Sequence, residues 1–144
     1  MKLLLICRDA VENSIFTNLL WAMEGKKRGN DVSVLFTEEA LAALAGEASD
    51  WSPLLRDRDR RTKIAKKAAE QGLPTYPAPT RGFPAIDTIE LVKKVRAAGV
   101  SLYACPVWVN FLELEGKLPD EITELDSSAF WKVIEEAETI IGNF

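Results

Sequence analysis

The chain has 144 residues, of which 47% are hydrophobic and 28% are charged, and its formal net charge at pH 7 is −4. This composition is typical of a soluble globular protein and predicts one domain with a core of its own. The acidic balance argues against general nucleic-acid binding, which requires a basic surface, and no apolar run approaches the length of a membrane span.

The chain has two cysteines and no histidine. The cysteines form no Cys-x-x-Cys pair, so we predict neither a disulfide framework nor a zinc site, as fits a reducing cytoplasm. The opening Met1–Cys7 is too short for a signal peptide, because Arg8 and Asp9 end its apolar run. The glycines form no phosphate-binding motif, so we expect no cofactor and no metal, with a carboxylate-only metal site as the alternative.

Strands and helices alternate in the first third of the chain. The apolar run Leu3–Cys7 predicts a strand buried on both faces. A stripe at helical spacing follows and ends at Gly29, and residues Asp31–Phe36 predict the second strand. Thr37 is the expected cap of the next helix, which would stop near Gly46.

The stretch from about 47 to 83 breaks this alternation. Prolines punctuate or bound it, so we predict an irregular, partly helical insertion with a short charged helix over Asp59–Gln71. A second regular unit then starts with a helix capped by Asp87 that ends at Gly99. The later expected elements, in chain order, are a strand Val100–Ala104, a helix up to Gly116, a strand Ile122–Leu125, a helix capped by Ser127 or Ser128, and a strand Thr139–Ile141.

These elements predict a single three-layer α/β domain of about five mostly parallel strands with helices on both faces. In such sheets the ligand site lies at the carboxyl ends of the strands. The strands before Cys7 and Cys105 both deliver a cysteine to that edge. In a flavodoxin-like 2-1-3-4-5 strand order, these two strands would be neighbours.

Cys105 is the strongest candidate for a functional residue. It follows a buried strand and precedes Pro106, which is favoured in the first turn of a helix. The unpaired N–H groups and the dipole of a helix start lower the pKa of a thiol and make a thiolate available. The alternative is a buried cysteine that only fills space.

Three segments resemble the DsrE/DsrF-like family of small α/β proteins, which includes sulfur-relay subunits. They are the opening strand and helix, the run Gly99–Cys105 and the ending Ala137–Phe144. The resemblance covers most of the chain apart from the insertion, and it implies a DsrE-like fold and a homo-oligomer, either trimer or hexamer. In the sulfur-relay members the matching cysteine carries sulfane sulfur as a persulfide, so the resemblance implies that role for Cys105, with a protein sulfur donor or acceptor as partner.

Four other residues are weighed as supporting members of the site. Cys7 is interpreted as core filler, with a resolving thiol for Cys105 as the alternative. Arg8 either supplies positive charge near a thiolate or belongs to a solvated loop. Tyr103 is expected to pack against the sheet, and Trp108 to roof the site or to join a core or subunit interface.

Two charged segments suggest an assembly mode. Residues Arg56–Lys67 hold seven basic and two acidic residues, and Glu113–Glu138 holds nine carboxylates against two lysines. The basic segment is interpreted as a solvated helix, as a docking site for an acidic partner or anionic cofactor, or as a surface that meets the acidic segment of another subunit. A weaker alternative is an anionic cofactor at the sheet edge, contacted by Arg8 or Arg81. If Cys105 is a packing residue, the protein is a non-catalytic oligomeric binding or assembly module.

Overall fold

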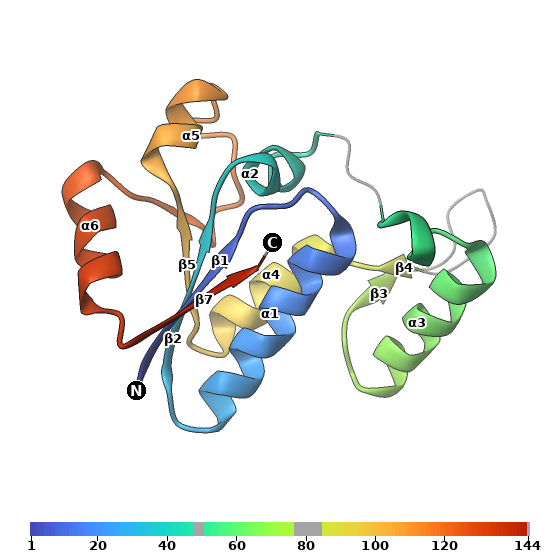
Figure 1. Ribbon diagram of the computed structural model, residues 1–144. Coiled ribbons are helices and arrows are strands. Elements are labelled where there is room, and N and C mark those ends of the chain that lie inside the picture. The colour runs from blue at the N-terminus through green and yellow to red at the C-terminus, as the bar shows by residue number, and fades with distance from the viewer. Residues whose placement is uncertain (48–50, 77–84, 144) are drawn as a thin grey trace.

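A five-stranded parallel sheet forms the centre of the protein (Figure 1). The structure is a computed structural model that describes residues 1–47, 51–76 and 85–143. The strands run in the order β6-β5-β2-β1-β7 across the sheet. Their bounds are β1 Lys2–Cys7, β2 Asp31–Phe36, β5 Ser101–Ala104, β6 Thr123–Glu124 and β7 Thr139–Asn143. The predicted α/β class, with its parallel sheet and its helices, is confirmed.

The strand order differs from the 2-1-3-4-5 order considered from the sequence. Strand β2 pairs with β1 on one side and with β5 on the other, so the strands that end at Cys7 and lead to Cys105 are not neighbours. The connections from β1 through β6 each move one place in the same direction across the sheet, and only the last connection returns to the far side of β1. The sequence pattern does not encode the direction of these steps.

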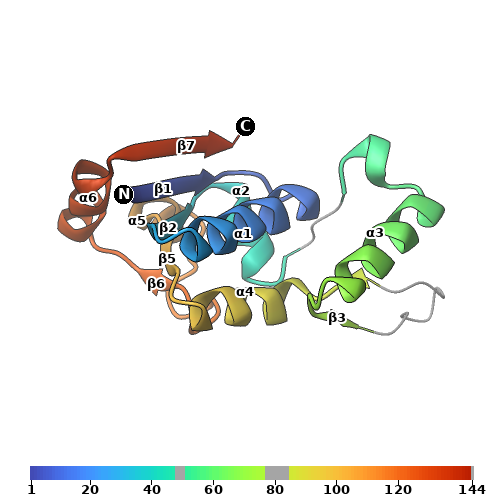
Figure 2. The ribbon, with the colours of Figure 1, turned by 90° about the horizontal axis from the view of Figure 1, so that it is seen from below.

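The direction of the connections also decides which helices cover which face. Successive right-handed crossovers in one direction place their helices on one face, and a reversal places the next helix on the other face. Accordingly α1 (Glu12–Lys27) and α4 (Thr88–Ala97) pack together on one face, and α6 (Ser127–Glu136) lies on the opposite side (Figure 2). The three-layer arrangement therefore follows from the strand order.

The face of the sheet beneath α1 and α4 is its most completely buried face. Alternate residues of β1 and β2 are almost fully buried there, among them Leu5, Cys7, Val32 and Val34. Gly25 of α1 lets the helix approach closely, because a Cβ at this position would lie 3.3 Å from a methyl group of Val32. On the other face α6 contributes only partly buried side chains, so this layer covers the sheet less completely.

The remaining helices lie in the connections. They are α2 (Glu39–Leu44), the single 3-10 turn η1 (Pro53–Leu55), α3 (Arg58–Glu70) and α5 (Pro106–Phe111). Within the described residues, no helix has both the length and the apolar character needed to cross a membrane.

Several predicted helix ends shift by a few residues. Thr37 does not cap α2, because Glu38 follows with φ 53° and ψ −131° and the helix starts after it. Asp126, rather than Ser127 or Ser128, caps α6 and accepts a hydrogen bond from the N–H of Ala129 at 2.8 Å. The helix after Cys105 ends at Phe111, well before Gly116.

Residues 47–83 contain more regular structure than the sequence suggested. Helix α3 is capped by Asp57, whose carboxylate accepts from the N–H of Arg60 at 3.0 Å. A short antiparallel pair, β3 (Thr75–Tyr76) with β4 (Ala85–Ile86), was not predicted. The parts of this stretch at 48–50 and 77–83 lie outside the described residues.

Candidate functional site

Cys105 lies at the carboxyl end of β5, immediately before α5. Its N–H donates to the carbonyl of Phe36 at 3.0 Å, which extends the β2–β5 pairing by one residue. Pro106 is the first residue of α5, as predicted, and the side chain of Cys105 makes no capping hydrogen bond. Cys105 is a free cysteine with 7% of its surface exposed. The thiol therefore sits at the predicted edge but largely beneath the surface.

Cys7 is a core residue and not a partner of Cys105. It is fully buried, and its register partner on β2 is Phe36, which in turn aligns with Ala104 on β5. Two strand spacings amount to about 9–10 Å between Cα atoms, whereas a disulfide requires less than about 7 Å. Burial, reinforced by the charge of Asp9, raises the pKa of Cys7 to about 12. The resolving-thiol interpretation of Cys7 is therefore wrong, and its interpretation as core filler fits the structure.

Arg8 is held by Glu38 across the same edge. Its Nε donates to a carboxylate oxygen of Glu38 at 2.7 Å, and the carbonyl of Arg8 accepts from the N–H of Ala40 at 3.0 Å. The side-chain hydrogen bond to Glu38, together with the negative charge of Glu38, raises the pKa of Arg8. Because Glu38 balances the positive charge of the guanidinium, Arg8 is not an unpaired cation that would stabilise a thiolate.

A hollow of about 530 Å³ opens beside this ion pair. We call it the edge hollow; its lining is Arg8, Glu38, Glu39, Ala42, Glu47, Trp108 and Leu112. Trp108 and Leu112 come from α5 and its end, and the carboxylates come from α2 and its flanks. The edge hollow therefore has one apolar wall and one acidic wall, and the volume is within the range of small-molecule pockets.

Trp108 contributes the apolar wall as a half-buried side chain. Its ring meets Phe111 edge-on, with centroids 5.7 Å apart. Phe111 is 67% exposed and Val107 is 50% exposed, so α5 presents apolar surface to solvent directly after Cys105. Trp108 thus lines the edge hollow, while Val107 and Phe111 on the same helix are exposed to solvent.

Tyr103 does not join this site. It lies on β5 one residue before Ala104 and lines a separate hollow toward the other end of the sheet, with Ser33, Ser101 and Val133. The expectation that it packs beside the sheet fits this position. Arg81 lies outside the described residues.

Glu38 is a site residue that could not be predicted from the sequence. Its φ of 53° and ψ of −131° fall in a region that side-chain-bearing residues rarely occupy. Strained backbone of this kind costs about 1–3 kcal/mol and clusters at functional sites. No residue pattern predicts this conformation, and the signal that the sequence offered was the place of Glu38 in the short connection between a strand and a helix.

The chemistry of this edge is limited to a thiol, an ion pair and a few carboxylates. In the described part of the chain, no group of three or more cysteine or acidic residues is arranged to hold a metal ion. Cys105 supplies the nucleophilic atom, and the edge hollow supplies space lined by Trp108 next to its helix. A single thiol at such an edge can accept or pass a group by attack on sulfur without a metal.

The architecture has known counterparts, although no family model and no curated protein matches the sequence. The crystal structure of the ychN protein from E. coli is similar over 99% of both chains, with a TM-score of 0.63 and 12% sequence identity. A conserved protein of unknown function from Bacteroides thetaiotaomicron, BT1422, is similar over 99% of this chain and 94% of its own, with a TM-score of 0.59 and 11% identity. At these identities the likeness concerns the fold alone: the chain has a parallel-sheet α/β fold similar to that of ychN.

Proposed function

We propose that this protein is a sulfur carrier that uses Cys105 as its persulfide-bearing residue. The observation that carries the proposal is the position of Cys105 between the end of β5 and the start of α5, the helix whose Trp108 lines the edge hollow. In the reaction, the Cys105 thiolate attacks the outer sulfur of a donor persulfide. A new sulfur–sulfur bond forms on Cys105, and the donor leaves as a thiolate. No oxidant, metal or cofactor is required for this exchange.

The surroundings of Cys105 support this role over any role for Cys7. Cys7 has no exposed surface and a pKa of about 12, so it remains a protonated thiol at neutral pH. Cys105 retains a small exposed fraction, and its sulfur makes no capping hydrogen bond. Trp108, the largest side chain on α5, is three residues after Cys105 and lines the edge hollow.

The expected partners are a protein sulfur donor or acceptor and further copies of this chain, as a trimer or hexamer, in the cytoplasm. Val107 and Phe111 support a docking role for α5, because they expose apolar surface within two turns of Cys105. The basic helix α3 and the acidic helix α6 lie at opposite ends of the molecule (Figure 1), so charge attraction between them would act between subunits.

Intact-protein mass spectrometry tests the proposal. The protein is incubated with a low-molecular-weight persulfide donor, then desalted and weighed. We expect a gain of one sulfur atom in the wild type and in Cys7→Ala, and none in Cys105→Ser. Because the chain has only two cysteines, these variants assign the sulfur completely. A native protein that gains no sulfur, or gains it equally in Cys105→Ser, would remove the proposal.

A second function is favoured by the burial of both cysteines. Here the protein is a non-catalytic binding or assembly module, the edge hollow is its ligand site, and Cys105 is a packing residue. This alternative predicts that iodoacetamide labels Cys105 only after denaturation, and that Cys105→Ala leaves the oligomeric state unchanged. Labelling of Cys105 in the native protein at neutral pH contradicts it.

A further inference from the structure

An apolar groove lies between α1 and α3, remote from the edge hollow. Its volume is about 290 Å³, near the lower end of the range for small-molecule sites. The apolar lining is contributed by both helices and by the segments around β3 and β4: Phe16, Leu20, Ile64, Ala68, Leu73 and Ile86. The polar lining residues are Lys63, Lys67 and Gln71. We call this hollow the α1–α3 groove.

The groove exists because α3 is fastened to the domain at its two ends. At one end the indole N–H of Trp51 donates to Glu12 at 2.8 Å, and its ring packs on Phe16 with centroids 5.3 Å apart. At the other end the ammonium of Lys94 donates to the carbonyl of Gly72 at 2.6 Å. These contacts join the segments that flank α3 to α1 and to α4, and so fix the position of α3 beside the groove.

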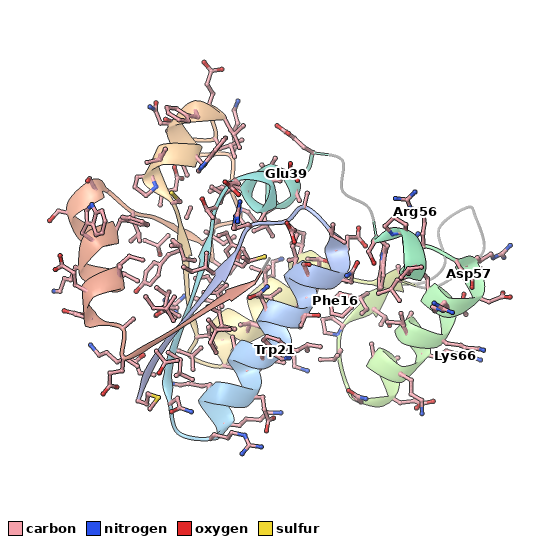
Figure 3. All side chains as sticks on the ribbon, viewed as in Figure 1. Phe16, Trp21, Glu39, Arg56, Asp57 and Lys66 are labelled. Atoms are coloured by element: carbon pink, nitrogen blue, oxygen red, sulfur yellow. The ribbon has the colours of Figure 1, made fainter. Side chains whose placement is uncertain are left out.

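Small side chains on α3 keep the space between these ends open. Ala65 and Ala68 are the buried residues of α3, and a methyl group is too short to fill the gap to Phe16 and Leu20. Figure 3 shows Phe16 on the side of α1 that faces α3, and Lys66 on the side of α3 turned away from it. The groove therefore has a fixed apolar floor and is not a gap closed by long side chains.

The charge at the groove has a single sign. Lys63 and Lys67 lie one helical turn apart on α3, about 6 Å along its axis. Lys67 meets Glu70 only loosely, at 3.7 Å with both side chains highly exposed, and Lys63 has no ion-pair partner among the described residues. Among the residues that the structure describes, no carboxylate lines the groove. One anionic group placed between the two ammonium groups would contact both.

We propose that the α1–α3 groove binds a small amphipathic carboxylate, with an apolar body on the floor and its acid group between Lys63 and Lys67. With the acid group between Lys63 and Lys67, about 9 Å of the helix axis remains as far as Gln71, which suits a medium-length acyl chain. The apolar lining residues would supply affinity by burying the acyl chain, and the two lysines would select a ligand with a negatively charged head group. This ligand site is independent of the thiol at the sheet edge.

Isothermal titration calorimetry with octanoate tests the proposal, with octanol as the ligand of the same apolar body and no charge. We expect saturable one-to-one binding of octanoate and weaker binding of octanol. Lys63→Gln and Lys67→Gln should each weaken octanoate binding about two- to fivefold, as for a solvent-accessible ion pair, and leave octanol unchanged. Lys66→Gln, on the outer side of the same helix, is the matched control and should change neither.

A filling variant tests the floor. Ala68→Phe should abolish binding of both ligands, and circular dichroism should show that the variant keeps the helix content of the wild type, although phenylalanine at this nearly buried position lowers its melting temperature. As a readout that needs no variant, the methyl NMR signals of Ile64 and Ile86 should shift with octanoate, while those of Val107 on α5 should not. The proposal is overturned by absence of saturable binding, by equal losses in Lys66→Gln and Lys63→Gln, or by shifts at Val107 without shifts at Ile64.

Discussion

The backbone of Glu38 gives a sharp test of strain at the sheet edge. At φ 53° and ψ −131° this residue sits where only glycine is comfortable, which costs about 1–3 kcal/mol. Replacement by glycine relieves that strain but adds about 0.5–1 kcal/mol of conformational entropy to the unfolded chain. Replacement by alanine keeps the strain. Both variants lose the ion pair with Arg8, so its contribution cancels in the comparison. We expect Glu38→Gly to be more stable than Glu38→Ala by about 1 kcal/mol.

Glu24 provides the matched control for this comparison. It lies inside α1 and also forms an exposed ion pair, with Arg28 at 3.2 Å. There the order should reverse, with Glu24→Ala more stable than Glu24→Gly by about 0.5–1 kcal/mol, because glycine weakens a helix interior. Urea unfolding followed by circular dichroism measures all four free energies. If the alanine variant is more stable than the glycine variant at both positions, the backbone of Glu38 is not strained, which refutes this prediction.

Three further predictions concern the core, the insertion and a turn. The pKa of Cys7 is raised from 9.0 to about 12 in the folded protein, so its contribution to stability is present below pH 9 and is lost as the pH rises toward 12. Urea unfolding of the wild type should therefore lose up to about 1.4 kcal/mol per pH unit across this window relative to Cys7→Ala, and parallel profiles would contradict the assignment. Trp51→Ala should remove the anchor of α3 and cost about 3 kcal/mol, seen as faster hydrogen exchange in α3 but not in β1; uniform loss of protection would show that α3 is not a separate unit. Gly99→Ala should lower stability by about 1 kcal/mol in thermal unfolding, since φ is 97° at Gly99, and an unchanged melting temperature would refute this.

The local parts of the fold were predictable because each depends on neighbouring residues. The apolar run Asp31–Phe36 forms the strand it predicted, with the same bounds. Asp87 caps α4 by accepting from the N–H of Glu90 at 3.0 Å, as expected. Pro106 occupies the first position of α5, also as expected, because proline is favoured in the first turn of a helix. Periodicity, caps and glycine stops act over a few residues, so the sequence displays them directly.

The strand order was not predictable in the same way. Whether β5 lies next to β1 or next to β2 depends on which way each crossover turns across the sheet, and the same apolar strands suit either arrangement. The inferred proximity of Cys7 and Cys105 depended on that order and is wrong. The arrival of Cys105 at the carboxyl edge depended only on the strand and helix around it, and it is confirmed.

The edge hollow is a second feature that could not be predicted from the sequence. Its acidic wall is built from Glu38, Glu39 and Glu47, which the sequence presented as helix-start and loop residues. Their convergence with Trp108 depends on the turn at Glu38, and that turn has an unusual backbone conformation without a sequence signature. Single residues such as Cys105 were therefore easier to anticipate than the group that surrounds them.

The pairing of β1 with β7 has a consequence for how the chain folds. Strand β1 is made first, yet one of its two neighbours in the sheet is Thr139–Asn143, and the N–H of Glu138 donates to the carbonyl of Lys2 at 2.9 Å. During synthesis β1 can pair with β2 early, but its other edge stays open until residue 143 has left the ribosome. Contacts of such long sequence separation form late and slow the final step. Between the synthesis of β1 and that of β7, a nascent chain would therefore expose an apolar strand edge, and in that period a chaperone or a premature partner would meet it.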